Sequence, residues 1–286
     1  MYIKAYAKIN VALNVLGKDE NGYHQLDMVN LPLELHDSIE ITVLPPDSKD
    51  SFITCDDIEI EDTKYNLITI AIAKAREKYH FKEQFAIRVY KEIPISAGLA
   101  GGSSNAGAIL NALFQLLKIK TSEQDKIELA KSIGADVPFC LFNLPARVRG
   151  IGEIIEPIKV KKNYQVLIVK PVKGLSTKNV FAKADDMELI QSNIDQVVTA
   201  LAAGDDELLA SSVHNALEAS SFALLPEIGK IKESLLNDGL KIVFMSGSGS
   251  SVIAFDNDPK KLIRLEKKYA KMGYDTRLTR TLRSKI

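Results

Sequence analysis

Hydrophobic and polar residues alternate along the first stretch of the chain. From Ile3 to Val15 every odd position is apolar, whereas the even positions are mostly polar or tyrosine. A period of two over this length is typical of a half-buried β-strand. The alternation places Lys8 and Asn10 on the same face of the strand. A sheet face in contact with water is the ordinary interpretation of such a pair.

Further patterns define the rest of the N-terminal half. Helical spacing of apolar residues predicts a helix over Asn66–Tyr79, with Asn66 as its N-cap, and another over Ser122–Ile133 that ends at Gly134. Residues 17–23 have the composition of a turn, and residues 45–62 are acidic and indicate an excursion or hairpin. Strands are expected at 38–44 and 85–90, and the segment "GADVPFCLF" at 134–142 is expected to be a loop that runs into a strand.

The C-terminal half has a different pattern. A strand is predicted over 164–171, three helical stretches over 186–203, 205–221 and 226–238, and a strand–turn–strand unit over 240–256. A basic helix over 258–272 and a last strand follow. The change of pattern predicts two domains, residues 1–155 and 156–286, and the order of strands and helices is compatible with an α+β chain.

Composition excludes several classes of protein. The 37 basic and 37 acidic residues cancel, so the chain lacks the basic surplus of a nucleic-acid-binding protein. No stretch of the sequence is apolar enough to predict a membrane span or a signal peptide. Cys55 and Cys140 lie far apart and have no metal or redox spacing. We therefore expect a cytoplasmic protein that binds neither membranes nor nucleic acid.

The segment "IPISAGLAGGSSNAGAIL" (residues 93–110) carries the strongest chemical signal. Four glycines and two adjacent serines precede an amphipathic helix that includes Ala106, Ile109 and Leu113. The first N–H groups of a helix have no internal partners, and the helix dipole adds partial positive charge there. Because glycines allow close approach and positive φ, the segment predicts a phosphate cradle.

Two common phosphate motifs do not match this segment. A Walker A loop requires lysine, and none occurs between Lys91 and Lys118. The glycine spacing also differs from that of a dinucleotide-binding fingerprint. A tight packing turn between a strand and a helix is the structural alternative.

Three motifs instead resemble those of the GHMP small-molecule kinases. They are Pro94-x-x-x-Gly98-Leu-Ala-Gly101-Gly102-Ser103-Ser104, "AKIN" at 7–10 and "MSGSGSS" at 245–251. The segments "GYH" (22–24), "GADVPF" (134–139), "GIGE" (150–153) and "STKNVF" (176–181) resemble one group within it, the 4-diphosphocytidyl-2-C-methyl-D-erythritol kinases. The resemblance implies a ribosomal-protein-S5-like N-terminal domain and a ferredoxin-like C-terminal domain. It also implies ATP-dependent phosphorylation of the substrate's 2-hydroxyl in the non-mevalonate isoprenoid pathway.

The resemblance assigns roles to individual residues. Asp136 matches the catalytic aspartate, and Lys8 matches a lysine expected near it that keeps the carboxylate ionised and stabilises the transferred phosphoryl group. The ATP site would comprise Asn66, Lys91 and the continuous run Pro94, Ile95, Ser96, Ala97, Gly98, Leu99, Ala100, Gly101, Gly102, Ser103 and Ser104. Mg²⁺ would arrive with ATP, with Ser103 or Ser104 as candidate ligands, since no metal-binding cluster is apparent.

The substrate site is also assigned from the resemblance. Tyr23 and Phe181 match two aromatic residues that hold a cytosine ring between them, and His24 would read the edge of that ring. Asn10 and Thr177 would contact the rest of the substrate. We expect a monomer or a weak homodimer whose partners are this small molecule and ATP.

Alternatives remain open at this point. A sister kinase for homoserine, mevalonate or a sugar would share the glycine segment but need not carry "GYH" or Phe181. A non-catalytic relative would be expected to lack Lys8 or Asp136, and the chain has both. The basic segment "NLPARVRG" (143–150) departs from the family pattern, so Arg147 and Arg149 either reach a phosphate or are merely solvated.

Overall fold

The computed structural model describes residues 1–56 and 66–282 and divides into two compact units that interleave along the chain. Unit 1 comprises residues 1–7, 35–93 and 100–143, and unit 2 comprises 8–34, 94–99 and the chain from 144 onward. The long strands β1 (Tyr2–Lys18) and β2 (His24–Val43) contribute to both units and pair with each other. The expected boundary near residue 155 stays a prediction.

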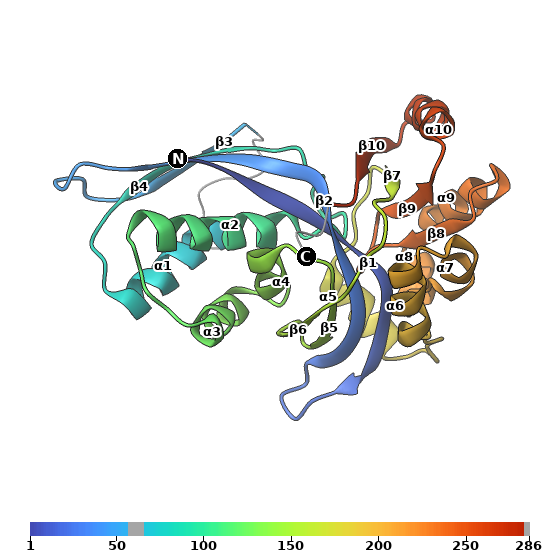
Figure 1. The fold of residues 1–286 in the computed structure, drawn as a ribbon, viewed down its shortest axis with the longest axis horizontal. Helices are drawn as coiled ribbons and strands as arrows, with labels where there is room; N and C mark the ends of the chain where they lie inside the picture. Colours follow the sequence, from blue (N-terminus) through green and yellow to red (C-terminus); the bar gives the residue numbers. More distant parts are fainter. Residues whose placement is uncertain (57–65, 283–286) are drawn as a thin grey trace. The chain divides into compact units, whose positions relative to one another are not determined.

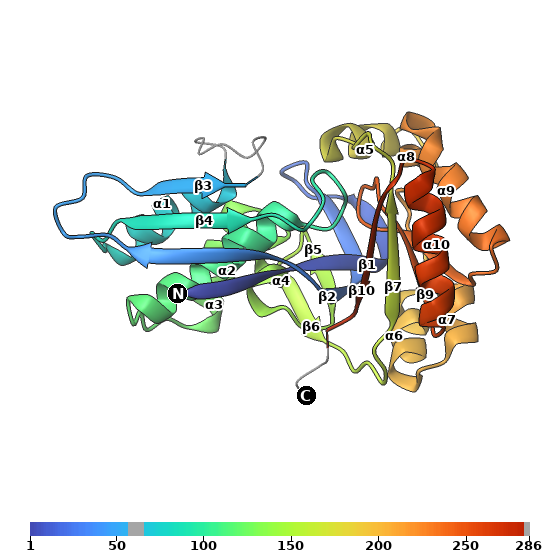
Figure 2. The same cartoon turned by 90° about the horizontal axis from the view of Figure 1, so that it is seen from above.

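Unit 1 is a sheet with helices packed on one face (Figures 1 and 2). The short strand β3 (Phe52–Cys55) is parallel to β4 (Phe85–Tyr90), which is antiparallel to residues 38–43 of β2. The helices are α1 (Leu67–Tyr79), α2 (Gly101–Leu116), α3 (Glu123–Ile133) and α4 (Val137–Phe142). In Figure 2 the strands of this unit lie in front of its helices, so the described helices cover one face of the sheet.

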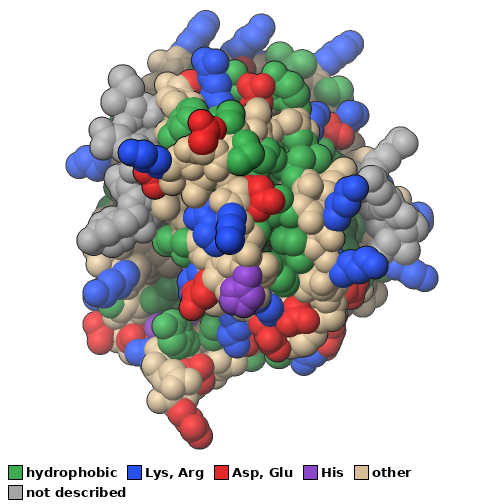
Figure 3. All heavy atoms as spheres, turned by 90° about the vertical axis from the view of Figure 1, so that its left-hand side faces the viewer, with side chains coloured by type: hydrophobic (Ala, Val, Ile, Leu, Met, Phe, Trp, Pro, Cys, Tyr) green, Lys and Arg blue, Asp and Glu red, His purple; other side chains and the backbone are tan. Residues whose placement is uncertain are grey.

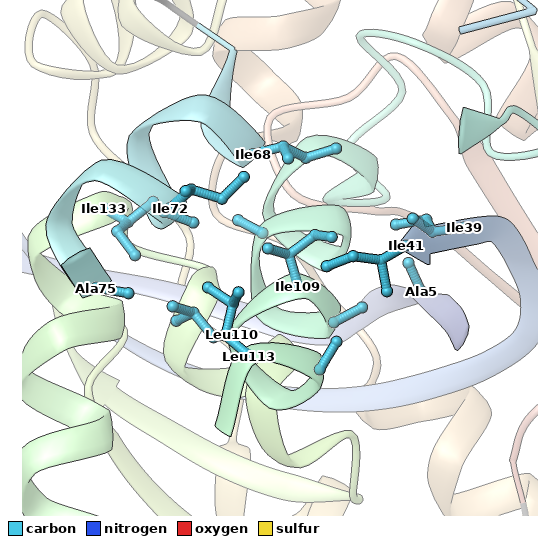
Figure 4. Packing of buried hydrophobic residues seen from close by; sticks show 14 of the residues in the cluster. Ala5, Ile39, Ile41, Ile68, Ile72, Ala75, Ile109, Leu110, Leu113 and Ile133 are labelled. Atoms are coloured by element: carbon cyan, nitrogen blue, oxygen red, sulfur yellow. The ribbon is translucent and has the colours of Figure 1, made fainter. Parts of the chain in front are cut away.

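The core of unit 1 follows from the two hydrophobic periods (Figure 4). Alternate residues of β2, Ile39 and Ile41, point toward the helices and are fully buried. Ile109 and Leu113, four residues apart on α2, belong to the same cluster and are also fully buried. A strand period of two and a helix period near 3.6 therefore supply a single apolar layer.

Most predicted elements of unit 1 are confirmed. The Asn66 side chain accepts a hydrogen bond from the Ile68 N–H at 2.9 Å and begins α1. Ser122 and Gly134 flank α3 as its caps. The strand expected after Gly134 is wrong, because residues 137–142 form α4 with its proline in the first turn, where a missing N–H costs nothing. The expected excursion at 45–62 includes β3, and its residues 57–62 lie outside the described residues.

Unit 2 contains two groups of strands. Residues 26–30 of β2 pair with β5 (Ala146–Gly150), which pairs with β6 (Ile154–Pro157). A separate antiparallel sheet has the order β10-β7-β9-β8, formed by β7 (Gln165–Lys170), β8 (Ile242–Met245), β9 (Val252–Asp256) and β10 (Asp275–Arg280). Helices α9 (Pro226–Asn237) and α10 (Pro259–Lys271) pack on it. This strand order, fourth-first-third-second, is ferredoxin-like.

The helical region of unit 2 differs in detail from the prediction. The stretches expected at 186–203 and 205–221 are α6 (Ile194–Ala203), α7 (Asp206–Ser212) and α8 (Glu218–Leu224). Helix α6 starts late because Gln191 and Ser192 are hydrogen-bonded to β1 instead, with the Ser192 N–H donating to Asn14 Oδ1 at 2.7 Å. Helix α5 (Thr177–Ala184) and the strands β5 and β6 were not predicted.

The surface agrees with the balanced charge of the sequence. Figure 3 shows basic and acidic side chains interspersed over one face of the molecule. Among residues 1–56 and 66–282, the structure has no helix that is both long and apolar enough to cross a membrane.

Candidate active site

Lys8 and Asn10 are buried, with exposed fractions of 3% and 0%, so the interpretation of a solvated sheet face is wrong. Lys8 Nζ donates to Asn10 Oδ1 at 2.7 Å, and Asn10 Nδ2 donates to Asn30 Oδ1 at 2.7 Å. A buried ammonium is costly unless polar partners surround it. The asparagine pair therefore fixes the position of Lys8, and Asn30 is a contributor that sequence reasoning missed.

The turn at 246–251 packs against the first half of the glycine segment, residues 94–99, within unit 2. Ser246 Oγ donates to the Gly98 carbonyl at 2.9 Å and accepts from the Asn10 N–H at 3.2 Å. A Cβ added to Gly98 would lie 2.1 Å from the Ser246 carbonyl oxygen, and its φ is +72°. Glycine is thus required at residue 98 by both space and backbone conformation. The "MSGSGSS" turn therefore packs against the glycine segment and holds the backbone at Gly98 in place.

The other glycines of the segment serve different purposes. Gly101 and Gly102 open α2, and a Cβ on Gly102 would meet only Leu67 Cδ1 at 3.6 Å. A Cβ on Gly107 would lie 2.9 Å from the backbone of Cys140, so this glycine allows α2 to approach α4 closely. Positive φ occurs at Gly98 and also at Ser96 and Ala100. The N–H groups of the first turn of α2 have no partners within the helix, as an anion-binding helix start requires.

Ser103 and Ser104 have different environments in unit 1. The Ser104 side chain is buried, and its hydroxyl donates to the Tyr6 carbonyl at 2.7 Å and lies 3.3 Å from Cys140 Sγ. The Ser103 side chain is half-buried. Ser103 is therefore the better placed of the two to reach a bound ligand.

Lys91 forms a buried ion pair that sequence reasoning missed. Its Nζ contacts Asp37 Oδ2, and Asp37 Oδ1 accepts from the N–H groups of Glu92 and Ile93, each at 2.9 Å. The Asp37 side chain is fully buried. This carboxylate holds the chain at the start of the glycine segment and places the Lys91 ammonium beside Gly101, 3.3 Å from where its Cβ would be.

Asp136 precedes the first turn of α4 as its N-cap residue and is half-buried. Its side chain makes no capping hydrogen bond, although short polar residues usually cap helices in this way. The carboxylate is thus not used to begin α4. Asp136 lies in the short connection between Gly134, the C-cap of α3, and α4, and its catalytic role stays a prediction.

Of the two aromatic residues assigned to the substrate, Phe181 contacts His24. The His24 ring lies on Phe181 of α5, with centroids 4.5 Å apart and an angle of 30° between the planes. His24 Nε2 lies 2.7 Å from Asp185 Oδ1, and Lys18 Nζ donates to Asp185 Oδ2 at 2.6 Å. The hydrogen bonds from Lys18 and His24 lower the pKa of Asp185. Asp185 lies one helical turn after Phe181, which is the signal that could have identified it.

Tyr23 and Thr177 lie at more open positions of unit 2. Tyr23 follows the β1–β2 turn and is 62% exposed, and its N–H donates to Asp19 Oδ1 at 2.9 Å. Thr177 opens α5, and its hydroxyl lies 2.9 Å from that of Ser248. The structure thus brings His24 together with Phe181, and Thr177 together with the 246–251 turn.

The two unassigned arginines are ion-paired. Arg147 makes a bidentate contact with Asp27, at 2.9 and 2.7 Å, and a further one with Asp195. Arg149 pairs with Glu156 on the adjacent strand β6. These pairs stabilise the β2–β5–β6 ladder, which favours a structural role over phosphate binding.

No group of three potential metal ligands occurs among residues 1–56 and 66–282.

The model of the GHMP kinases N-terminal domain matches residues 66–143, and that of the GHMP kinases C-terminal domain matches residues 197–275. A 4-diphosphocytidyl-2-C-methyl-D-erythritol kinase of Clostridium kluyveri is 38% identical over 262 residues, 91% of this chain and 92% of the relative. One of Lachnoclostridium phytofermentans is 37% identical over 99% of this chain and 98% of the relative.

Solved structures agree with the sequence relatives. The chain is similar to a crystal structure of 4-(cytidine 5'-diphospho)-2C-methyl-D-erythritol kinase, with a TM-score of 0.82 and 27% identity over 99% of this chain and all of the other. A homoserine kinase from Cytophaga hutchinsonii shares the fold at a TM-score of 0.76 and 19% identity, covering 99% of this chain and 94% of that one. The two-domain α+β fold class predicted from the sequence is confirmed.

Proposed function

We propose that this chain, which belongs to the family of 4-diphosphocytidyl-2-C-methyl-D-erythritol kinases within the GHMP kinases, transfers the γ-phosphoryl group of ATP to the 2-hydroxyl of that substrate. The observation that carries the proposal is the identity of 37% over 99% of the chain, which includes every segment assigned to the site. The buried Lys8, the glycine segment that opens α2 and the His24–Phe181 pair support it.

ATP binding rests on the helix N-terminus in this proposal. The β- and γ-phosphates would be held by the N–H groups at the start of α2, where partial positive charge favours anions. Mg²⁺ would accompany ATP, and the hydroxyl of Ser103 is the better placed serine ligand. Lys91, which Asp37 fixes beside Gly101, would offer its ammonium as a hydrogen-bond donor in the same region.

Catalysis of phosphoryl transfer consists mainly of positioning the reactants and stabilising negative charge, so few chemical groups are needed. Asp136 would orient the substrate hydroxyl and accept its proton, which is the role of a general base. Lys8 would stabilise negative charge on the transferred group, and its burial strengthens that effect because the local dielectric is low.

Recognition of the cytidyl group would use unit 2 alone. Phe181 and the exposed Tyr23 offer aromatic faces for a base, and His24 offers a polar edge. Thr177 and Asn10 would complete the substrate site. The division of the chain into domains at residue 155, a cytoplasmic location and a monomer or weak homodimer belong to the same proposal.

A coupled assay of ADP release tests the proposal directly. Purified protein with MgATP is expected to turn over 4-diphosphocytidyl-2-C-methyl-D-erythritol, with mevalonate and homoserine as control substrates. Turnover of either control at a kcat/KM equal to or above that of the cytidyl substrate would assign the chain to a sister kinase. ADP release without any acceptor would indicate ATP hydrolysis instead.

A further inference from the structure

The His24 side chain is held by two residues, one of which is fixed in turn by a third. Phe181 contacts one face of the imidazole, with ring centroids 4.5 Å apart, and Asp185 Oδ1 lies 2.7 Å from Nε2. Lys18 takes the other oxygen of Asp185 at 2.6 Å. Phe181 belongs to α5, Asp185 is the C-cap of that helix and Lys18 belongs to β1, so the His24 ring is fixed by tertiary structure and not by its own strand β2.

The chemistry of Asp185 determines which ring nitrogen carries the proton. A carboxylate that is ionised can only accept hydrogen bonds, and Lys18 beside it favours the ionised form. His24 Nε2 must therefore be the donor in its contact with Asp185. In the neutral ring, Nδ1 is then left with a lone pair and acts as an acceptor.

Stacking by itself cannot select a pyrimidine. Every base has a π-face, so an aromatic side chain can stack on any of them without discriminating between bases. Cytosine and uracil differ at position 4, where cytosine presents an amine donor and uracil a carbonyl acceptor. A fixed acceptor next to the stacking ring would accept a hydrogen bond from the cytosine amine. The same acceptor would face the carbonyl oxygen of uracil, which cannot donate a hydrogen bond, so cytosine would be favoured.

Resting on the proposed function, we infer that Asp185 is a positioning residue for base selection: it holds His24 in the Nε2–H tautomer, so that Nδ1 accepts from the exocyclic amine of cytosine. Lys18 supports this arrangement by engaging the second oxygen of the carboxylate. Asp185 itself does not touch the base. Its effect is expected on base preference and on the His24 ring, and not on ATP.

The test compares Asp185→Ala with Asp186→Ala, the matched exposed aspartate at the next position. Cytidine 5′-diphosphate and uridine 5′-diphosphate are titrated by calorimetry against the parent, both variants and His24→Ala. In Asp185→Ala the preference for the cytidine nucleotide is expected to fall by about two- to tenfold, the range that one hydrogen bond corresponds to. Asp186→Ala should keep the parent preference.

A spectroscopic measurement separates positioning from general damage. The ¹⁵N chemical shifts of the His24 ring in labelled protein report the tautomer, and Asp185→Ala is expected to convert an Nε2–H ring into a mixture. The double variant Asp185→Ala/His24→Ala should show no greater loss of preference than His24→Ala alone, because both changes remove one contact.

The possible failures are distinct. A parent protein that binds the two nucleotides equally would refute cytosine recognition and hence the proposed function at this site. If His24→Ala loses the preference while Asp185→Ala keeps both the preference and the tautomer, only the inference about Asp185 is overturned. A thermal melt of Asp185→Ala that matches the parent establishes that the variant is folded.

Discussion

At the scale of single residues, the candidate site depends on polar side chains that already have a hydrogen-bonding or ion-pair partner within the protein. Lys8 is bound to Asn10, Lys91 to Asp37, and His24 to Asp185. In the first two pairs the lysine is buried, and its burial without a partner would be costly. The same pairing fixes the position of the group before any ligand arrives, which is the condition for effective electrostatic catalysis.

Asp136→Asn tests the catalytic assignment. The amide is nearly isosteric, and the native side chain does not cap α4, so the fold should be retained. Loss of a general base is expected to lower kcat by about 10²–10⁴-fold with little change in ATP affinity. Asp125→Asn, at the first turn of α3, removes the same charge and should leave kcat unchanged. Near-parental kcat in Asp136→Asn would remove this residue from the mechanism.

Tyr23→Ala tests the stacking assignment. Since Tyr23 is 62% exposed, its truncation should not change the free energy of unfolding appreciably. One lost aromatic face is expected to weaken binding of cytidine 5′-diphosphate by about 1–3 kcal/mol, or roughly five- to 150-fold. Tyr2→Ala, which truncates a tyrosine that is 76% exposed, is the matched control. Calorimetric titration gives both values, and equal affinities would exclude Tyr23 from the base site.

At the scale of elements, the glycines around the start of α2 are of two kinds: some are required by packing and one is not. Gly98 and Gly107 are constrained by neighbouring backbone, whereas Gly102 has room for a methyl group. A glycine that is not needed for packing is destabilising in a helix by about 0.5–1 kcal/mol relative to alanine. Its presence at 102 is explained if a ligand approaches the backbone there.

Gly102→Ala and Gly107→Ala are therefore expected to behave in opposite ways. Gly102→Ala should retain or raise the stability to urea but weaken ATP binding, because its Cβ would occupy the space of a phosphate. Gly107→Ala should lower the stability by about 1–3 kcal/mol through the clash with Cys140, and it should not act on ATP selectively. Urea unfolding and ATP titration of both variants check this. Normal ATP affinity in Gly102→Ala would contradict a phosphate contact at this turn.

At the scale of the whole molecule, two ligands are expected to stabilise the chain independently. A ligand that binds only the folded state adds about 2.7 kcal/mol at 100 times its Kd. Thermal unfolding with MgATP, and separately with cytidine 5′-diphosphate, should show a higher midpoint in each case. Tyr23→Ala should lose only the second shift and Gly102→Ala only the first. A variant that loses both shifts in the unfolding midpoint would contradict two independent sites, because the substitution would then have disturbed the whole fold.

Local patterns in the sequence determined many of the elements because their causes are local. The alternation of β1, the caps Asn66 and Ser122, and the small-residue turn between β8 and β9 all act within a few neighbouring residues. The order of the "AKIN", glycine-rich and "MSGSGSS" motifs along the sequence indicated the family, and the family models and relatives confirm it. The fold class and the candidate residues followed from these motifs.

Only the tertiary structure decided which polar groups are buried and which partners they have. The period of β1 placed Lys8 and Asn10 on one face but could not show that this face is covered, because the covering residues come from positions near 30 and 246. Asp185 is 161 residues from His24, and Asp37 is 54 residues from Lys91. Such contacts depend on how the chain returns to itself, and no local pattern encodes that path. The late start of α6 has the same origin, because hydrogen bonds of Gln191 and Ser192 to β1 replace the first turns of the helix that local spacing favours.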